Sequence, residues 1–528
     1  MLFNSYEFIC VFLPIALLGF FTVGKIGHYR WAIAFLVAAS LFFYGWWNPP
    51  YLLLILGSIL FNYCLGSLLS KDSVSSTLKR KGLLIFGMAV NLGSIGYFKY
   101  ANFFADTVNA IANANIDLGD IFLPLGISFF TFQQISYLVD AYNGETKEYN
   151  FLRYCLFVSF FPQLIAGPIV LHKEVLPQFA QKAIYHFNRE NLSVGITIFS
   201  IGLFKKVIFA DTVALYATPV FDAAANGATL SFFEAWCGAL AYTMQLYFDF
   251  SGYSDMAIGA ARMFGIKLPL NFNSPYKAVN ISEFWRRWHM TLSRFLRDYL
   301  YIPLGGNRQG KIRRYVNLMI TMLLGGLWHG AGWNFVLWGG LHGSYLVIHQ
   351  QWLQFRKLLG QDIKAKGSWW SRVLGCVLTF FVVVVAWVFF RATSMEAAGA
   401  MLTAMFGGNG ISLPGFTEKF LGFLPSAIVQ FNGILAGSKT ALPSPLAMFW
   451  IVLLLAIAWG APNTQQWMER ANPALDYPAE FPSGRLGNVW WEKLQWKPTP
   501  QWSVVVGLAA GLSLVFLLRP TEFLYFQF

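Results

Sequence analysis

Long apolar runs alternate with short polar loops along most of the chain. Four runs approach the roughly 20 residues that an α-helix needs to cross a bilayer. These are residues 31–47, 51–70, 373–390 and 502–518. Counting such runs over the whole sequence predicts about eleven to thirteen crossings. The pattern therefore predicts an all-α polytopic membrane protein.

Charged residues interrupt the apolar pattern between residues 121 and 250, where they indicate re-entrant or cavity-lining segments. They are Arg153, Lys205, Lys206 and Glu234. Composition agrees with the membrane class, because 528 residues that are 56% hydrophobic and 12% charged cannot hide their apolar surface in one soluble core. Because the sequence shows no internal repeat and no Ser/Gly linker between globular parts, we predict a single transmembrane domain over residues 1–528.

The formal charge of +13 lies in short loops between spans, with no basic and aromatic module typical of nucleic-acid binding. Positively charged loops face the cytoplasm. The loop residues Lys25, Arg30 and Lys79–Lys81 therefore predict an N-terminus on the outer side of the membrane. Residues 277–314 form a cytoplasmic basic loop with nine cations. These are Lys277, Arg286, Arg287, Arg294, Arg297, Arg308, Lys311, Arg313 and Arg314.

The same count continues through the C-terminal part of the chain. It places the polar stretch 391–444 outside and the stretch 462–501 inside. The last span, 502–518, then runs outward and delivers the aromatic tail "TEFLYFQF" to the outer side. Tyr525 is a hydroxyl among phenylalanines there, which fits either an aromatic belt at the interface or a chemical role.

The arginine-rich stretch within 277–314 has helical spacing. An apolar stripe of Trp285, Trp288, Leu292 and Phe295 predicts an amphipathic helix at the cytoplasmic surface. Its cations either anchor lipid headgroups or face inward with His289, where guanidinium groups suit the phosphates of a nucleotide-type donor. The candidate phosphate contacts are Arg286, Arg287 and Arg294.

His329 stands in "GLWHGAGWN" between two apolar runs, among glycines and tryptophans. A polar side chain at membrane depth is costly to bury, so this imidazole is expected to have a structural or chemical role. It is either a satisfied core histidine or a general base in a narrow passage, taking a proton from a hydroxyl. No histidine pair has metal-ligand spacing, so we expect no metal.

Several motifs together resemble the membrane-bound O-acyltransferase superfamily, in the bacterial branch that includes the alginate O-acetyltransferase membrane subunit. They are "FNSYEFICVFLP", "FFYGWWNPPYLLLIL", "FDFSGYSDMAIG", "NFNSPY", "EFWRRWHMTLSRFLRDYLYIPLGGNR" and "LWHGAGWNFVLWGGLHG". The resemblance covers most of the chain. It implies a ring of tilted helices around a tunnel, with His329 as the catalytic residue and His289 at the cytoplasmic entrance.

The resemblance also implies the reaction: transfer of an acyl group, most simply from acetyl-CoA, to a hydroxyl for O-acetylation of an extracytoplasmic polysaccharide. Alginate, cellulose, peptidoglycan and other glycans stay open as acceptors. Asn334 or the indole of Trp333 would stabilise the oxyanion, while Asp249 and Asp255 either support the site or join helices. The alternative function is a polysaccharide or lipid-linked sugar exporter that uses the same tunnel.

The tail acquires a further interpretation from the teichoic-acid D-alanyl transferase, a related protein with a small partner whose aromatic C-terminus bears a tyrosine. The final span with "FLYFQF" is similar to that partner fused in line. Tyr525 would then carry the acetyl group to a periplasmic esterase-like transferase of the SGNH type. Membrane lipids are the remaining expected partners.

Overall fold

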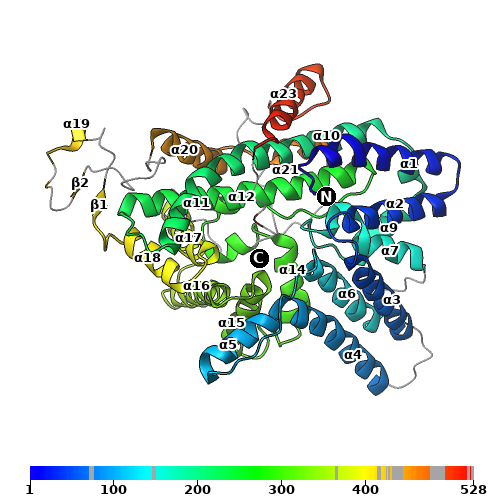
Figure 1. Cartoon of the computed structure of the whole chain (residues 1–528), viewed down its shortest axis with the longest axis horizontal. Helices are drawn as coiled ribbons and strands as arrows, with labels where there is room; N and C mark the ends of the chain where they lie inside the picture. Colours follow the sequence, from blue (N-terminus) through cyan, green and yellow to red (C-terminus); the bar gives the residue numbers. More distant parts are fainter. Residues whose placement is uncertain are drawn as a thin grey trace.

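A computed structural model gives the fold of most of the chain (Figure 1). It describes residues 1–70, 77–145, 150–362, 367–412, 418–423, 425, 429–430, 444–475, 494–519 and 524. Helices account for nearly all regular structure in these ranges. The only described strands are β1 (Ile411–Ser412) and β2 (Val429–Gln430), a parallel pair of two residues each.

The N-terminal part consists of helices joined by short loops. In chain order they are α1 (Leu13–Lys25), α2 (Tyr29–Gly45), α3 (Tyr51–Ser70), α4 (Thr77–Ile95), α5 (Ala101–Ala112), α6 (Ile127–Tyr142), α7 (Phe151–Ser159), α8 (Phe161–Leu164) and α9 (His172–Phe179). π-helical turns at Glu7–Phe12 and Gly96–Tyr100 precede α1 and α5. In Figure 1, α3, α4 and α6 lie together at one end of the molecule.

The central part is built on α12 (Phe232–Met263), which is buried along almost its whole length. It packs against α10 (Arg189–Phe204) and α11 (Asp211–Ala225), which a π-helical segment at Lys205–Ala210 connects. Figure 1 shows α10 and α11 following one another along α12. Two short helices follow, α13 (Ile281–Trp285) and α14 (Met290–Leu296), and a π-helical turn at Arg297–Tyr301 ends this part.

The C-terminal part begins with a helical hairpin of α15 (Lys311–His329) and α16 (Trp333–Leu358). The later helices are α17 (Trp369–Arg391), α18 (Met395–Met405), α19 (Glu418–Leu421), α20 (Pro445–Gly460), α21 (Thr464–Trp467) and α23 (Pro500–Phe516). Short 3-10 turns occupy Lys182–Tyr185, Pro275–Lys277 and Glu469–Ala471.

The apolar runs of the sequence are helices in the structure: α2, α3, α17 and α23 cover the four runs named above. By length and composition, the described residues contain five helical segments able to cross a membrane. They are Glu7–Lys25, Tyr51–Leu69, Thr77–Ala112, Arg189–Ala225 and Trp369–Arg391. Shorter apolar helices occupy Tyr29–Gly45, Pro445–Gly460 and Pro500–Phe516. The all-α, multi-pass membrane architecture is confirmed, and the total of eleven to thirteen crossings stays a prediction.

The prediction of one continuous amphipathic helix over 285–297 is wrong, because the helix is interrupted. The chain leaves the helix after Trp285 and resumes it at Met290, with His289 in a left-handed conformation between the two helices. The apolar stripe is also not a lipid-facing surface, because Trp288, Leu292 and Phe295 are buried inside the protein. The spacing identified the buried face correctly but could not show the break.

Glycines bring the backbones of α10 and α12 into contact. A Cβ atom on Gly202 would lie 2.5 Å from the carbonyl oxygen of Gly252, and one on Gly252 would lie 2.7 Å from the carbonyl oxygen of Gly202. Gly195 and Gly259 make a second close approach of the same kind. Small residues at such crossings let membrane helices pack closely. This contact therefore sets the position of α12.

We predict that Gly252→Ala destabilises the protein by about 1–3 kcal/mol, because the added methyl group must push the two backbones apart. Gly511→Ala is the matched control, since a Cβ there has no atom within 4 Å. The measurement is the thermal unfolding temperature of both purified variants in detergent. Equal unfolding temperatures for the two variants would contradict the tight helix crossing.

Candidate functional site

His329 is the last residue of α15, and Gly330 continues the chain in an extended conformation (φ −160°, ψ 151°) toward α16. Glycines hold the two helices of this hairpin close together. A Cβ on Gly326 would lie 2.2 Å from the carbonyl oxygen of Phe335, and one on Gly339 would lie 2.3 Å from that of Met322. The "WHGAG" sequence thus ends one helix and starts the next with an imidazole at the bend.

The imidazole of His329 lines an internal cavity and is 8% exposed. Aromatic rings surround it: the ring centroids of Trp328, Trp338 and Phe390 lie 4.9, 5.1 and 5.2 Å from that of His329. The cavity is mostly apolar, with one carboxylate at its wall. Its lining residues are Leu246, Asp249, Phe250, Trp288, His329, Trp387, Phe390 and Leu524. Such walls exclude water, which strengthens electrostatic interactions inside.

His289 lies beside this cavity, fully buried, with its ring centroid 6.3 Å from that of His329. Its left-handed backbone (φ 43°, ψ 54°) turns the chain between α13 and α14. A non-glycine residue in this conformation costs roughly 1–2 kcal/mol, and such strain is often found at functional sites. The structure thus brings together the two histidines that lie forty residues apart in the sequence.

Asn271 fixes the protonation pattern of the His289 ring. Its Oδ1 accepts hydrogen bonds from the Thr291 hydroxyl at 2.9 Å and the Thr291 backbone N–H at 3.4 Å. This oxygen is also 3.1 Å from His289 Nδ1, which must therefore be the N–H donor in this pair. In the neutral ring Nε2 then carries the free lone pair, and it has no hydrogen-bond partner among the described residues. A proton acceptor is thus available beside the cavity.

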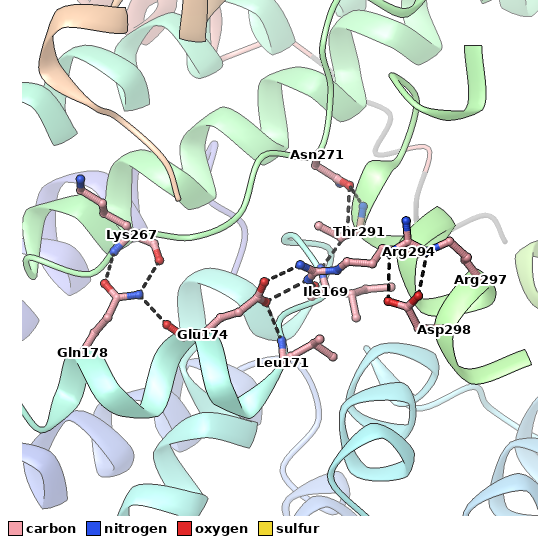
Figure 2. A network of polar contacts seen from close by, with 10 residues as sticks. All are labelled: Ile169, Leu171, Glu174, Gln178, Lys267, Asn271, Thr291, Arg294, Arg297 and Asp298. Carbon is pink, nitrogen blue, oxygen red and sulfur yellow. Dashed lines mark hydrogen bonds and ion pairs between the residues drawn. The ribbon is translucent and has the colours of Figure 1, made fainter. Parts of the chain in front are cut away.

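A polar network connects Asn271 to α9 and α14 (Figure 2). The Thr291 hydroxyl accepts a hydrogen bond from the backbone N–H of Ile169 at 3.0 Å. In the same network Arg294 pairs with Glu174, which also accepts a hydrogen bond from the backbone N–H of Leu171. These contacts help to hold the segment around His289 in place.

The three predicted phosphate-contact arginines have different surroundings. Arg294 forms the ion pair with Glu174, and Arg287 forms one with Glu283 at 2.8 Å. Arg286 is exposed at the surface. Because ion pairs already engage the charges of Arg287 and Arg294, Arg286 is the guanidinium most open to an anion in solution.

The structure shows other contacts for the two predicted oxyanion donors, whose catalytic role stays a prediction. The Asn334 amide donates to the carbonyl oxygens of Phe389 at 3.3 Å and Ala392 at 2.9 Å, so it joins α16 to the end of α17. Trp333 is 56% exposed and packs its ring against Phe103. The geometry gives Asn334 a helix-joining contact and leaves Trp333 at the surface.

The aspartates of the "FDFSGYSD" motif form buried ion pairs. Asp249 is 2.6 Å from Lys206 Nζ, which also pairs with Asp211 at 2.6 Å. Asp255 pairs with Lys205 at 2.6 Å and accepts a hydrogen bond from the Thr464 hydroxyl. Both aspartates therefore join α12 to neighbouring segments, and Asp249 also borders the His329 cavity.

Tyr525, the predicted acyl carrier, lies outside the described residues. Its neighbour Leu524 is described: it is 1% exposed and lines the cavity with His329. Sequence reasoning missed Leu524 and Phe390 as neighbours of His329, because they lie far from the "WHG" motif in the sequence; it also passed over Trp338, although this residue lies inside the motif "LWHGAGWNFVLWGGLHG". Asn271 had one signal, its place in the "NFNSPY" motif.

Comparison with known proteins identifies the family of the chain. The sequence model of the membrane-bound O-acyltransferase family matches residues 141–393, which include both histidines. A peptidoglycan O-acetyltransferase from Helicobacter pylori is 45% identical over 450 residues, which cover 80% of this chain and 83% of that protein. The chain belongs to the membrane-bound O-acyltransferase family, and it is an acyltransferase with several membrane-spanning helices.

Two further relatives extend the comparison. A probable alginate O-acetylase from Pseudomonas aeruginosa is 43% identical over 411 residues, covering 77% of this chain and 75% of that protein. A teichoic acid D-alanyltransferase from Streptococcus thermophilus is 30% identical over 280 residues, covering 50% of this chain and 68% of that protein. The family resemblance seen in the sequence motifs is confirmed.

We predict that Asn334→Ala lowers the free energy of unfolding by about 1–3 kcal/mol, because two carbonyl oxygens lose their donor. Asn109→Ala is the matched control: it also removes an amide-to-carbonyl bond, to Ile116, but at an exposed site. Thermal unfolding in detergent measures both. An unchanged unfolding temperature with a large loss of transferase rate in Asn334→Ala would instead assign its amide to the chemistry.

Proposed function

We propose that this protein transfers an acetyl group from cytoplasmic acetyl-CoA to a hydroxyl acceptor, for O-acetylation of an extracytoplasmic polysaccharide. The observation that carries the proposal is His329, which borders a mostly apolar cavity next to a second histidine with an available lone pair. The peptidoglycan and alginate O-acetylating relatives support a glycan as the final acceptor. An exporter would need no such pair of imidazoles.

In the proposed reaction His329 is the general base. It takes the proton from the acceptor hydroxyl, whose oxygen attacks the carbonyl carbon of the thioester. The tetrahedral oxyanion collapses, the carbon–sulfur bond breaks, and the departing CoA sulfur takes the proton from the imidazolium. We assign His289, whose ring centroid is 6.3 Å from that of His329, to proton movement at the cytoplasmic entrance.

The oxyanion needs a hydrogen-bond donor. With Asn334 joined to α17, the indole N–H of Trp338 is the better candidate. Its ring packs on His329, and its Nε1 is buried with no partner among the described residues.

Tyr525 is proposed as the acyl carrier. The support is Leu524, the residue before Tyr525 in the sequence, which is buried and lines the His329 cavity. Consecutive residues lie roughly 3.5 Å apart along an extended chain, so the proposed carrier follows directly on a cavity residue. Tyr525 would then pass the acetyl group to a periplasmic esterase-like transferase. In this proposal the protein lies in the inner membrane with its N-terminus outside.

The first expected result concerns His329→Ala, which should lower O-acetylation of cell-envelope polysaccharide at least about 100-fold, because the general base is lost. The measurement is the amount of acetate released from the polysaccharide by mild alkali, relative to the amount of protein in the membrane. His186→Ala, at an exposed histidine, is the control and should retain the wild-type level. Full acetylation in His329→Ala cells would overturn the proposed function.

The second concerns Tyr525→Phe, which keeps the ring and removes the acyl-accepting oxygen. Wild-type protein incubated with acetyl-CoA should gain one acetyl group on the C-terminal peptide by mass spectrometry, and Tyr525→Phe should gain none and lose polysaccharide acetylation. Tyr97→Phe, at an exposed tyrosine, serves as the control. Full activity of Tyr525→Phe would eliminate the carrier role and leave the rest of the proposal standing.

A further inference from the structure

The end of α15 has an unusual set of partners. The last four carbonyl groups of an α-helix have no donor within the helix, and a buried carbonyl without a partner is costly. The extended Gly330 carries the chain away from α15, so the helix does not turn back to close its own end. The carbonyl groups next to the catalytic imidazole therefore depend on donors from elsewhere in the chain.

Two consecutive residues of the N-terminal part supply these donors. Tyr100 donates its hydroxyl to the carbonyl oxygen of Leu327 at 2.7 Å. Lys99 Nζ donates to the carbonyl oxygens of Trp328 at 2.5 Å and His329 at 3.2 Å. Both residues belong to the π-helical turn Gly96–Tyr100, and such turns occur often at functional sites. The final three carbonyl groups of α15 thus bond to a segment about 230 residues earlier in the sequence.

The charge of Lys99 suits this position. The C-terminus of a helix carries a partial negative charge, which favours a cation there. Lys99 Nζ also lies 5.9 Å from the centroid of the Trp328 ring. Among the described residues, no carboxylate is within ion-pair distance of this ammonium group. The helix end and the indole are therefore the groups that offset its burial.

His329 has no comparable polar support on its side chain. Within the described part of the chain, no hydrogen bond reaches its ring nitrogens, and the imidazole is held by the rings packed around it. The polar contact nearest to the imidazole is the hydrogen bond that Lys99 donates to the backbone carbonyl oxygen of His329. A small displacement of reacting groups can cost a factor of about 100 in rate.

We propose that Lys99 is a positioning residue for acyl transfer and that Tyr100 supports it. Together they hold the end of α15 in place and thereby orient the His329 imidazole. The inference rests on the proposed role of His329. In this role Lys99 acts through the helix end, to whose carbonyl groups its ammonium donates. Its loss should therefore lower the rate of the chemical step and leave donor binding intact.

The test compares Lys99→Met with wild type in membrane vesicles containing the full chain, following thiol release from acetyl-CoA at varied concentration. Methionine keeps the length of the side chain and removes its charge and donors. We expect kcat to fall about 10- to 100-fold with KM changed less than about 3-fold. Lys99→Arg, which keeps the cation and its donors, should restore most of the rate.

Lys277→Met is the matched control, because Lys277 Nζ also donates to a carbonyl oxygen at a helix end, that of Ala461 after α20, at 2.7 Å. It should retain the wild-type kcat, and the unfolding temperatures of both methionine variants should be alike. If Lys99→Met fails to fold, Tyr100→Phe removes only the bond to Leu327 and should lower kcat about 3- to 10-fold without a change in KM.

A wild-type kcat in Lys99→Met, or in Tyr100→Phe when that variant is used instead, would overturn the inference. So would an equal loss of rate in Lys99→Met and Lys277→Met. His329→Ala, assayed in parallel, distinguishes failure of the proposed function from failure of the positioning role alone. A fully active His329→Ala defeats the proposed function itself, whereas an inactive His329→Ala beside a fully active Lys99→Met defeats only the positioning role.

Discussion

Backbone contact between α10 and α12 is the constraint on which the site depends. α12 lies inside the protein, and its polar side chains must find partners there because the surroundings offer no water. The glycine crossings at Gly202 and Gly252 bring it close enough for Lys206 to reach Asp249 and for Lys205 to reach Asp255. One face of the same helix then forms a wall of the His329 cavity.

The site combines rigid placement with a dry environment. His329 stands at a helix end, its backbone is bonded from another part of the fold, and aromatic rings enclose its imidazole. His289 is held in a strained turn by Asn271 with Nε2 left available. Preorganisation of this kind lets an enzyme stabilise developing charge without reorganising its surroundings during the reaction.

The sequence predicted the membrane helices well because a bilayer demands long apolar runs, as at 51–70 and 373–390. The motifs pointed to both histidines, and the structure places their ring centroids 6.3 Å apart, while their catalytic roles stay predictions. The sequence could not show that the helix breaks at His289, because the break depends on Asn271, which lies outside the local helical pattern. Nor could it relate Lys99 to His329, since a single lysine in an apolar run carries no signal of a helix end so far away in the chain.

We propose that acyl transfer takes place in the cavity bordered by His329. A cryo-electron microscopy structure of the full chain with a non-reactive thioether analogue of acetyl-CoA tests it most directly. The account predicts density for the acetyl end of the analogue beside the His329 imidazole, between Asp249 and Phe390. A well-ordered acetyl end bound elsewhere in the protein, with this cavity closed to it, would contradict the account.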